Sequence, residues 1–204
     1  MARRSAPEVN AGSMADIAFL LLIFFLVTTT IETDSGISRR LPEWQDEQQD
    51  PPDIKQRNIF EVLVNSNNQL LVEDEEMALE DLREAAVAFL DNGGGSGEDA
   101  CDFCQGAGAD DSSVNPKKAV ISLVNNRGTE YGTYIAVQNE LVAAYNVLRD
   151  REAQRMFGTT FTQMEANYND PKYNGDKDAL EEKIKVIKAM IPQILSEAEP
   201  MTSS

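Results

Sequence analysis

The most apolar stretch of the chain runs from Met14 to Ile31, MADIAFLLLIFFLVTTTI, and the sequence after it is water-soluble in character. At a rise of about 1.5 Å per residue, this run gives a helix of roughly 27 Å, close to the hydrocarbon thickness of a bilayer. Because every backbone amide in lipid needs a partner within its own segment, the run should be helical. The pattern predicts a transmembrane helix over 14–31, preceded by a short tail over 1–13.

One acid, Asp16, lies near the start of this run, and no Lys or Arg lies within it. A carboxylate there costs about 2.5–3.5 kcal/mol on insertion scales, so it usually has both a function and a partner. A counter-group for Asp16 has to come from another chain. We predict a working intramembrane carboxyl, and the alternative is a simple anchor with Asp16 at the membrane interface.

Three threonines, Thr28, Thr29 and Thr30, come near the end of the run. Their hydroxyl groups can donate to carbonyls one turn back, which lets polar side chains sit in a membrane helix. A role in a water or proton path is the other interpretation, and the sequence does not separate the two.

Two basic residues, Arg3 and Arg4, precede the run, whereas the acidic residues Glu32 and Asp34 directly follow it. The Lys/Arg bias places the N-terminus in the cytoplasm and the rest of the chain outside. A cleaved signal peptide is the alternative. The run is long for a signal peptide, however, and it ends without a small-residue cleavage site.

The chain of 204 residues has a formal net charge of -17 and no histidine. Such an acidic surface argues against nucleic acid and anionic membrane surfaces as partners. The lack of histidine removes the commonest general base and the commonest metal ligand. No nucleophile–base constellation is visible either, so we predict a protein that is not an enzyme and that needs no cofactor or metal.

Residues 32–54 form a polar, proline-containing stretch that predicts an extended linker. Within it, Ile37, Leu41 and Pro42 belong to a less polar segment that could add a strand to another sheet. A solvated spacer fits the same residues equally well.

The soluble domain is predicted over 55–199. Alternating and branched residues predict strands, and apolar residues at helical spacing predict helices. The strands are expected at 58–64, 69–72, 119–124 and 193–196, and the helices at 75–91, 130–156 and 178–190. This order predicts an α+β fold: a β-β-α-β-α domain with an extra C-terminal helix and a short final strand, the helices covering one face of a mixed sheet.

A Gly/Asp-rich insertion over 92–116 interrupts the domain, and its composition is typical of a flexible loop. It contains Cys101 and Cys104 as one C-x-x-C pair. A zinc site normally needs a second pair, and the glycine-rich flanks do not fit a thioredoxin-type redox site. A disulfide that staples the loop, or a pair of free thiols, is favoured over a redox function.

Taken together, these features resemble the ExbD/TolR family, the single-pass subunits of proton-driven inner-membrane motors. The resemblance covers nearly the whole chain. It rests on the Asn10-to-Asp16 spacing, which resembles the N-x-x-P-x-x-D opening of the family, on the apolar run, on the Leu41-Pro42 linker signature and on the strand–helix pattern after it. Ser13 stands where that opening has proline, and the segments 92–116 and 157–190 exceed the family pattern.

The resemblance implies an inner-membrane protein with a periplasmic domain that forms a homodimer, its helix pair threading the pore of an ExbB/TolQ-like multi-pass ring. It implies that Asp16 is the proton carrier. The output protein would be TonB-like, driving uptake across the outer membrane, or TolA-like, serving envelope integrity. A static membrane-anchored periplasmic adaptor is the alternative from another class.

Overall fold

The computed structural model describes residues 11–28 and 55–197, and the chain separates into two units, Met1–Gln49 and Asp50–Ser204. Each unit is described by itself. Of the predicted site residues, Thr29 and Thr30 and the linker residues Ile37, Leu41 and Pro42 lie outside the described residues.

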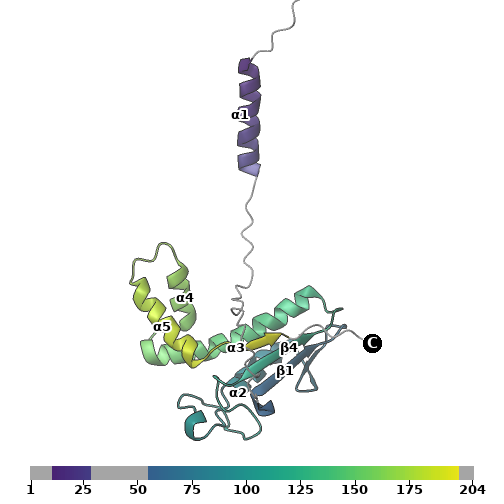
Figure 1. Ribbon diagram of the computed structural model, residues 1–204, viewed down its shortest axis with the longest axis vertical. Coiled ribbons are helices and arrows are strands. Elements are labelled where there is room, and N and C mark those ends of the chain that lie inside the picture. The colour runs from purple at the N-terminus through teal and green to yellow at the C-terminus, as the bar shows by residue number, and fades with distance from the viewer. Residues whose placement is uncertain (1–10, 29–54, 198–204) are drawn as a thin grey trace, which may run out of the picture. The chain divides into compact units, whose positions relative to one another are not determined.

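The first unit contains helix α1, Ala11–Thr28 (Figure 1). Its large apolar side chains between Met14 and Phe25 are 42–62% exposed, and they point to every side of the helix. A helix that is apolar all round is normally buried in lipid or among other helices. Within the residues that the structure describes, no helix combines the length and the apolarity that crossing a membrane requires.

The second unit is built on a five-stranded mixed sheet in the order β3-β2-β1-β4-β5. A short 3-10 turn, Gln56–Asn58, leads into it, and its strands are β1 Ile59–Val64, β2 Leu70–Val72, β3 Glu75–Met77, β4 Val120–Asn125 and β5 Leu195–Glu197. Strands β1, β2 and β3 form an antiparallel meander, whereas β4 pairs parallel with both β1 and β5. The predicted mixed α+β class is confirmed.

Strand β3 occupies positions where the sequence pattern predicts the start of a helix. Glu73 and Asp74 both have positive φ, 51° and 67°, in the two-residue connection between β2 and β3. Two such residues in succession reverse the chain tightly and return it along β2. Helix α2 therefore begins only at Leu79 and ends at Leu90.

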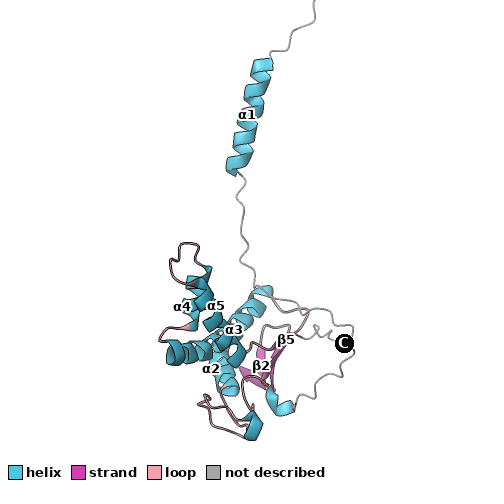
Figure 2. Cartoon of the chain, turned by 60° about the vertical axis from the view of Figure 1, so that its left-hand side comes forward, coloured by secondary structure: helices cyan, strands magenta, loops and turns pink. Residues whose placement is uncertain are grey.

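Helices α2 and α3, the latter spanning Tyr131–Phe157, lie on one side of the sheet (Figure 2). Alternate residues of β1, Phe60, Val62 and Val64, are buried against them, as the two-residue period of a strand requires. The rest of the main core comes from the inward faces of α2, β4 and α3, including Leu82, Ala86, Phe89, Ile121, Leu123, Val137, Leu141, Tyr145 and Leu148. The helices therefore cover one face, as expected.

A second, smaller core lies where helices α4, Phe161–Asn169, and α5, Lys177–Met190, form a hairpin against the C-terminal part of α3 (Figure 1). Its buried residues are Ala153, Phe161, Met164, Leu180, Ile184 and Ile187. Helix α4 lies between the helices expected at 130–156 and 178–190, where the sequence analysis predicts no helix. The hydroxyl of Thr160 accepts a hydrogen bond from the backbone N–H of Gln163 and so caps this helix.

Candidate functional site

Asp16 lies in the second turn of α1, with its side chain exposed among exposed apolar neighbours. Phe19 and Leu20, three and four residues further on, share its face of the helix and provide no counter-charge. The sequence of α1 contains no basic residue. Thr28 is the last residue of α1, so the structure describes only the first of the three predicted threonines as part of a helix.

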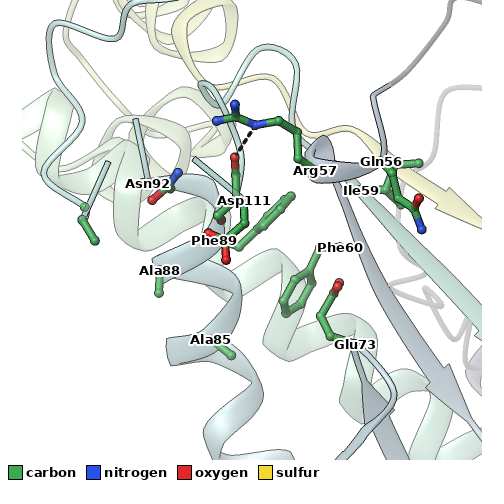
Figure 3. A pocket seen from close by; sticks show the side chains of 13 residues that line it. Gln56, Arg57, Ile59, Phe60, Glu73, Ala85, Ala88, Phe89, Asn92 and Asp111 are labelled. Carbon is green, nitrogen blue, oxygen red and sulfur yellow. Dashed lines mark hydrogen bonds between the residues drawn. The ribbon is translucent and has the colours of Figure 1, made fainter. Parts of the chain in front are cut away.

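A pocket of about 450 Å³ opens in the second unit between β1, α2 and the insertion 92–116. Figure 3 shows Phe60 and Phe89 inside it, with Arg57 near one end. The two rings pack at a centroid distance of 5.0 Å. Glu73 and Asp111 also line the pocket, which is therefore apolar at its base and charged at its edge.

Arg57 fixes the insertion through backbone carbonyls. Its Nε donates to the oxygen of Ser112 at 2.9 Å, and its Nη2 donates to the oxygens of Gly94 at 3.1 Å and Ala109 at 3.5 Å. Asn92 does the same from inside the loop, because its Nδ2 donates to the carbonyls of Ala109 and Ser113. A lone Arg at the start of a domain gives no recognisable pattern, so sequence reasoning missed this role.

Several glycines of the insertion pack too closely to allow a side chain. A Cβ added to Gly94 would lie 2.3 Å from the carbonyl oxygen of Ala109, and one on Gly95 would lie 2.1 Å from that of Asp99. At Gly106 the nearest atoms of Asp91 and Asn92 would be 2.6 Å away. In the insertion, for which a flexible loop is expected, the glycines permit close backbone contact within a hydrogen-bonded loop.

The two cysteines are joined in the structure by a Cys101–Cys104 disulfide, with a Cα–Cα distance of 5.5 Å. Phe103, between them, accepts a hydrogen bond at its backbone oxygen from Arg151 of α3. This contact fixes the cysteine turn to the rest of the domain. A short 3-10 helix, Gly97–Asp99, precedes the pair, but among the described residues no strand leads into the pair and no α-helix opens at it, so the arrangement is that of a loop staple.

Arg151, in the C-terminal part of α3, is the centre of an ion-pair network. It forms a two-fold contact with the carboxylate of Asp91, at 2.6 and 2.7 Å, and a further one at 3.2 Å with Glu152, which also pairs with Arg155. Hydrogen bonding to Asp91 raises the pKa of Arg151. The network links the end of α2, the insertion and α3, which is a structural task.

Nothing in the described ranges brings three or more potential metal-ligating side chains together. The functional features of the described part of the domain are the pocket between β1, α2 and the insertion, and the hydrogen-bonded insertion itself. Asp16, in the other unit, remains the candidate for charge movement.

Comparison with known families gives one match: the family described as "Biopolymer transport protein ExbD/TolR" matches residues 2–148. This range includes Asp16, the linker, the insertion and most of the sheet. Comparison with curated proteins finds no match. Members of this family are membrane-anchored subunits that energise transport, are not enzymes, and work with multi-pass and TonB-like proteins. Since the family match covers well over half of the 204 residues of the chain, the chain belongs to the ExbD/TolR family.

Proposed function

We propose that the protein is the single-pass subunit of an inner-membrane motor of the ExbB–ExbD type, driven by the proton-motive force, that energises TonB-dependent transport across the outer membrane. The observation that carries the proposal is Asp16: one acid in a helix without basic residues, in a chain of the ExbD/TolR family. In this proposal Asp16 is the residue that takes up and releases the proton.

The membrane placement follows from the apolar character of α1. Residues 14–31 span the inner membrane in this proposal, with Arg3 and Arg4 on the cytoplasmic side. The segment 32–54 is the periplasmic linker and 55–199 the periplasmic domain. The Cys101–Cys104 disulfide supports this side of the membrane, because disulfides persist in oxidising compartments.

Protonation of Asp16 changes which contacts its helix favours. Lipid and apolar side chains accept the neutral carboxyl, whereas the ionised form needs water or a cation from a partner. A proton that moves down about 100 mV releases about 2.3 kcal/mol. This is close to the insertion penalty of about 2.5–3.5 kcal/mol for the charge. One proton per step therefore supplies energy of the order needed to couple the charge state to the position of the helix.

The partners in this proposal are of the kinds with which the ExbD/TolR family works. A multi-pass ring of the ExbB/TolQ type surrounds a pair of these helices and supplies the polar partner that α1 lacks. Thr28, Thr29 and Thr30 continue the polar path toward the periplasm. The linker motif of Ile37, Leu41 and Pro42 and the periplasmic domain, as a homodimer, transmit the movement to a TonB-like output protein.

The test is an Asp16→Asn variant at unchanged expression, compared with Asp16→Glu and with Asp34→Asn as the control just beyond the apolar run. Energised uptake through an outer-membrane receptor should fall to the level seen with a protonophore in Asp16→Asn. It should be partly retained in Asp16→Glu and unchanged in Asp34→Asn. Full uptake by Asp16→Asn together with unchanged detergent resistance would rule out Asp16 as the carrier.

The same strains separate the two alternatives. If the output is TolA-like, Asp16→Asn leaves uptake intact but makes the cells sensitive to detergent. A static adaptor instead tolerates Asp16→Asn in both assays and fails only when the linker is changed, for example by Leu41→Asp.

A further inference from the structure

A second pocket, of about 430 Å³, lies between α3, α4, α5 and the turn that leads to β5. Its lining residues are Val142, Asn146, Arg149, Glu165, Lys188, Pro192 and Gln193. Five of these seven lie beyond residue 148, where the family match ends. The pocket is therefore largely a product of the C-terminal helices that this chain adds to the family pattern, and its role is independent of the proposed motor function.

Arg149 is the main polar group of this pocket, and it is only 5% exposed. Its Nε donates to the carbonyl oxygen of Ile191 at 3.0 Å. Its guanidinium lies 5.7 Å from the ring centre of Tyr145 and 5.2 Å from that of Phe161, within cation–π range. These contacts hold the guanidinium in place, but none of them is an ion pair. The carboxylate of Glu165 in the same pocket acts on the guanidinium only through its charge and partly opposes the effect of burial on the pKa of Arg149.

No carboxylate in the described parts of the chain lies within 4.0 Å of Arg149. Burial is the largest influence on the pKa of Arg149 and lowers it. Buried charges are normally paired, because an unpaired charge loses its hydration without compensation. A buried arginine at a pocket wall, in a chain with a net charge of -17, is therefore an unusual feature that calls for an anionic partner.

The neighbouring groups set the charge that such a partner should have. Lys188 forms an ion pair with Glu165 at 2.7 Å, so these two charges cancel. With Arg149 the pocket carries a net charge of +1. The side-chain amides of Asn146 and Gln193 make no hydrogen bond to other residues in the described ranges, and both line the same space. Spare amide donors thus stand beside the cation.

We propose that this pocket binds a single carboxylate group, held by the guanidinium of Arg149 with support from Lys188 and the amides of Asn146 and Gln193. A guanidinium fork matches the two oxygens of a carboxylate. A net charge of +1 balances one carboxylate, whereas a phosphate group carries nearly two negative charges. The carboxylate comes either from a small free anion or from an acidic side chain of a periplasmic protein, and both sources use the same chemistry.

The test uses the full chain in detergent micelles, uniformly labelled with ¹⁵N, and follows the Nε–Hε resonance of Arg149 by NMR. Two carboxylate probes are titrated at constant ionic strength: sodium acetate, and a short alanine peptide that contains one aspartate and is blocked at both ends. Acetamide and the matching asparagine peptide are the neutral controls. Arg83→Met, in the exposed ion pair between α2 and α3, is the matched control variant.

We expect a saturable shift with the carboxylates but not with the neutral probes. In variants that lack this resonance, the backbone amides of the pocket report binding. Affinity should fall at least tenfold in Arg149→Met and several-fold in Arg149→Lys, and it should be unchanged in Arg83→Met. If Arg149→Met does not fold, Lys188→Gln and Asn146→Ala replace it, each with an expected loss of three- to tenfold.

Tighter binding of the aspartate peptide than of acetate, by tenfold or more, identifies a protein side chain as the source. Equal or weaker peptide binding identifies a free carboxylate. The proposal is overturned if neither carboxylate saturates, if the neutral probes shift the resonance equally, or if the pocket variants bind as well as wild type.

Discussion

Replacement of Arg151 by methionine should lower the free energy of unfolding of the domain that contains the sheet by about 3 kcal/mol. The side chain of Asp91 is 9% exposed and that of Arg151 27% exposed, so this pair is largely removed from water. The two charge-assisted hydrogen bonds to Asp91 contribute about 1.5–3 kcal/mol each before allowance for the partial exposure of Arg151. Loss of one partner of a buried pair typically costs about 3–5 kcal/mol. The exposed part of Arg151 places the expected value near the lower end of that range.

The assay is urea unfolding of the full chain in detergent, followed by circular dichroism, with the disulfide kept intact. Arg155→Met is the matched control, since Arg155 also pairs with Glu152 but its side chain is 59% exposed. We expect it to cost no more than about 1 kcal/mol. A thermodynamic cycle with Asp91→Asn isolates the pair, with an expected coupling of about 2 kcal/mol.

The reasoning fails if Arg151→Met unfolds within about 1 kcal/mol of wild type. It also fails if the Asp91→Asn and Arg151→Met effects simply add. In either case, the contacts between Arg151 and Asp91 would not be what links the end of α2 to α3.

Three further predictions follow from the fold. Burial raises the pKa of Tyr145 to about 12, so its contribution to stability should be fully present below pH 10 and should fall by about 3 kcal/mol as the pH rises from 10 to 12. Tyr145→Phe should flatten this alkaline loss in unfolding curves. Gly106→Ala should destabilise the domain by at least about 2 kcal/mol, because the added Cβ would collide with the backbone of Asp91 and Asn92. Gly132→Ala, in the open first turn of α3, should stabilise the domain by about 0.5–1 kcal/mol; equal changes in the melting temperature of the two variants would contradict this. Arg57→Met removes the donors to three carbonyls of the insertion and should increase hydrogen exchange of the loop amides at least tenfold while exchange in β4 is unchanged.

Much of the domain could be predicted from its periodicity. The strands β1, β2 and β4 and the helices α3 and α5 lie within one or two residues of the expected positions, because each has a clear apolar face. Val137, Leu141, Tyr145 and Leu148 are buried as the spacing in α3 indicates, whereas Tyr134 is only partly buried.

Two elements escaped prediction for different reasons. Strand β3 is three residues long and mostly exposed, and its turn uses Glu73 and Asp74 in place of the glycine that usually indicates such a turn. Helix α4 is short and polar, but Thr160 and Gln163 have the spacing of a capping box, and this pattern was available in the sequence. Longer elements with one buried face are simply easier to recognise.

The candidate sites differ in the same way. Asp16 could be identified because a charge in an apolar run is a local feature of the sequence. Arg57 and Arg149 could not, because their partners are backbone carbonyls and aromatic rings that are distant in the sequence. Only the folded chain brings these groups together.

The central pairing of the sheet also sets the order in which the domain is made. Strand β1 pairs with β4, whose residues follow it by about sixty positions, and the meander, α2 and the whole insertion lie between them. Such non-local pairing is slow to form. A ribosome therefore releases the edge of β1 well before β4 emerges, and that edge stays open to chance association until then. In the proposed topology, export across the membrane lengthens this interval, and this proposal predicts that nascent chains depend on periplasmic chaperones.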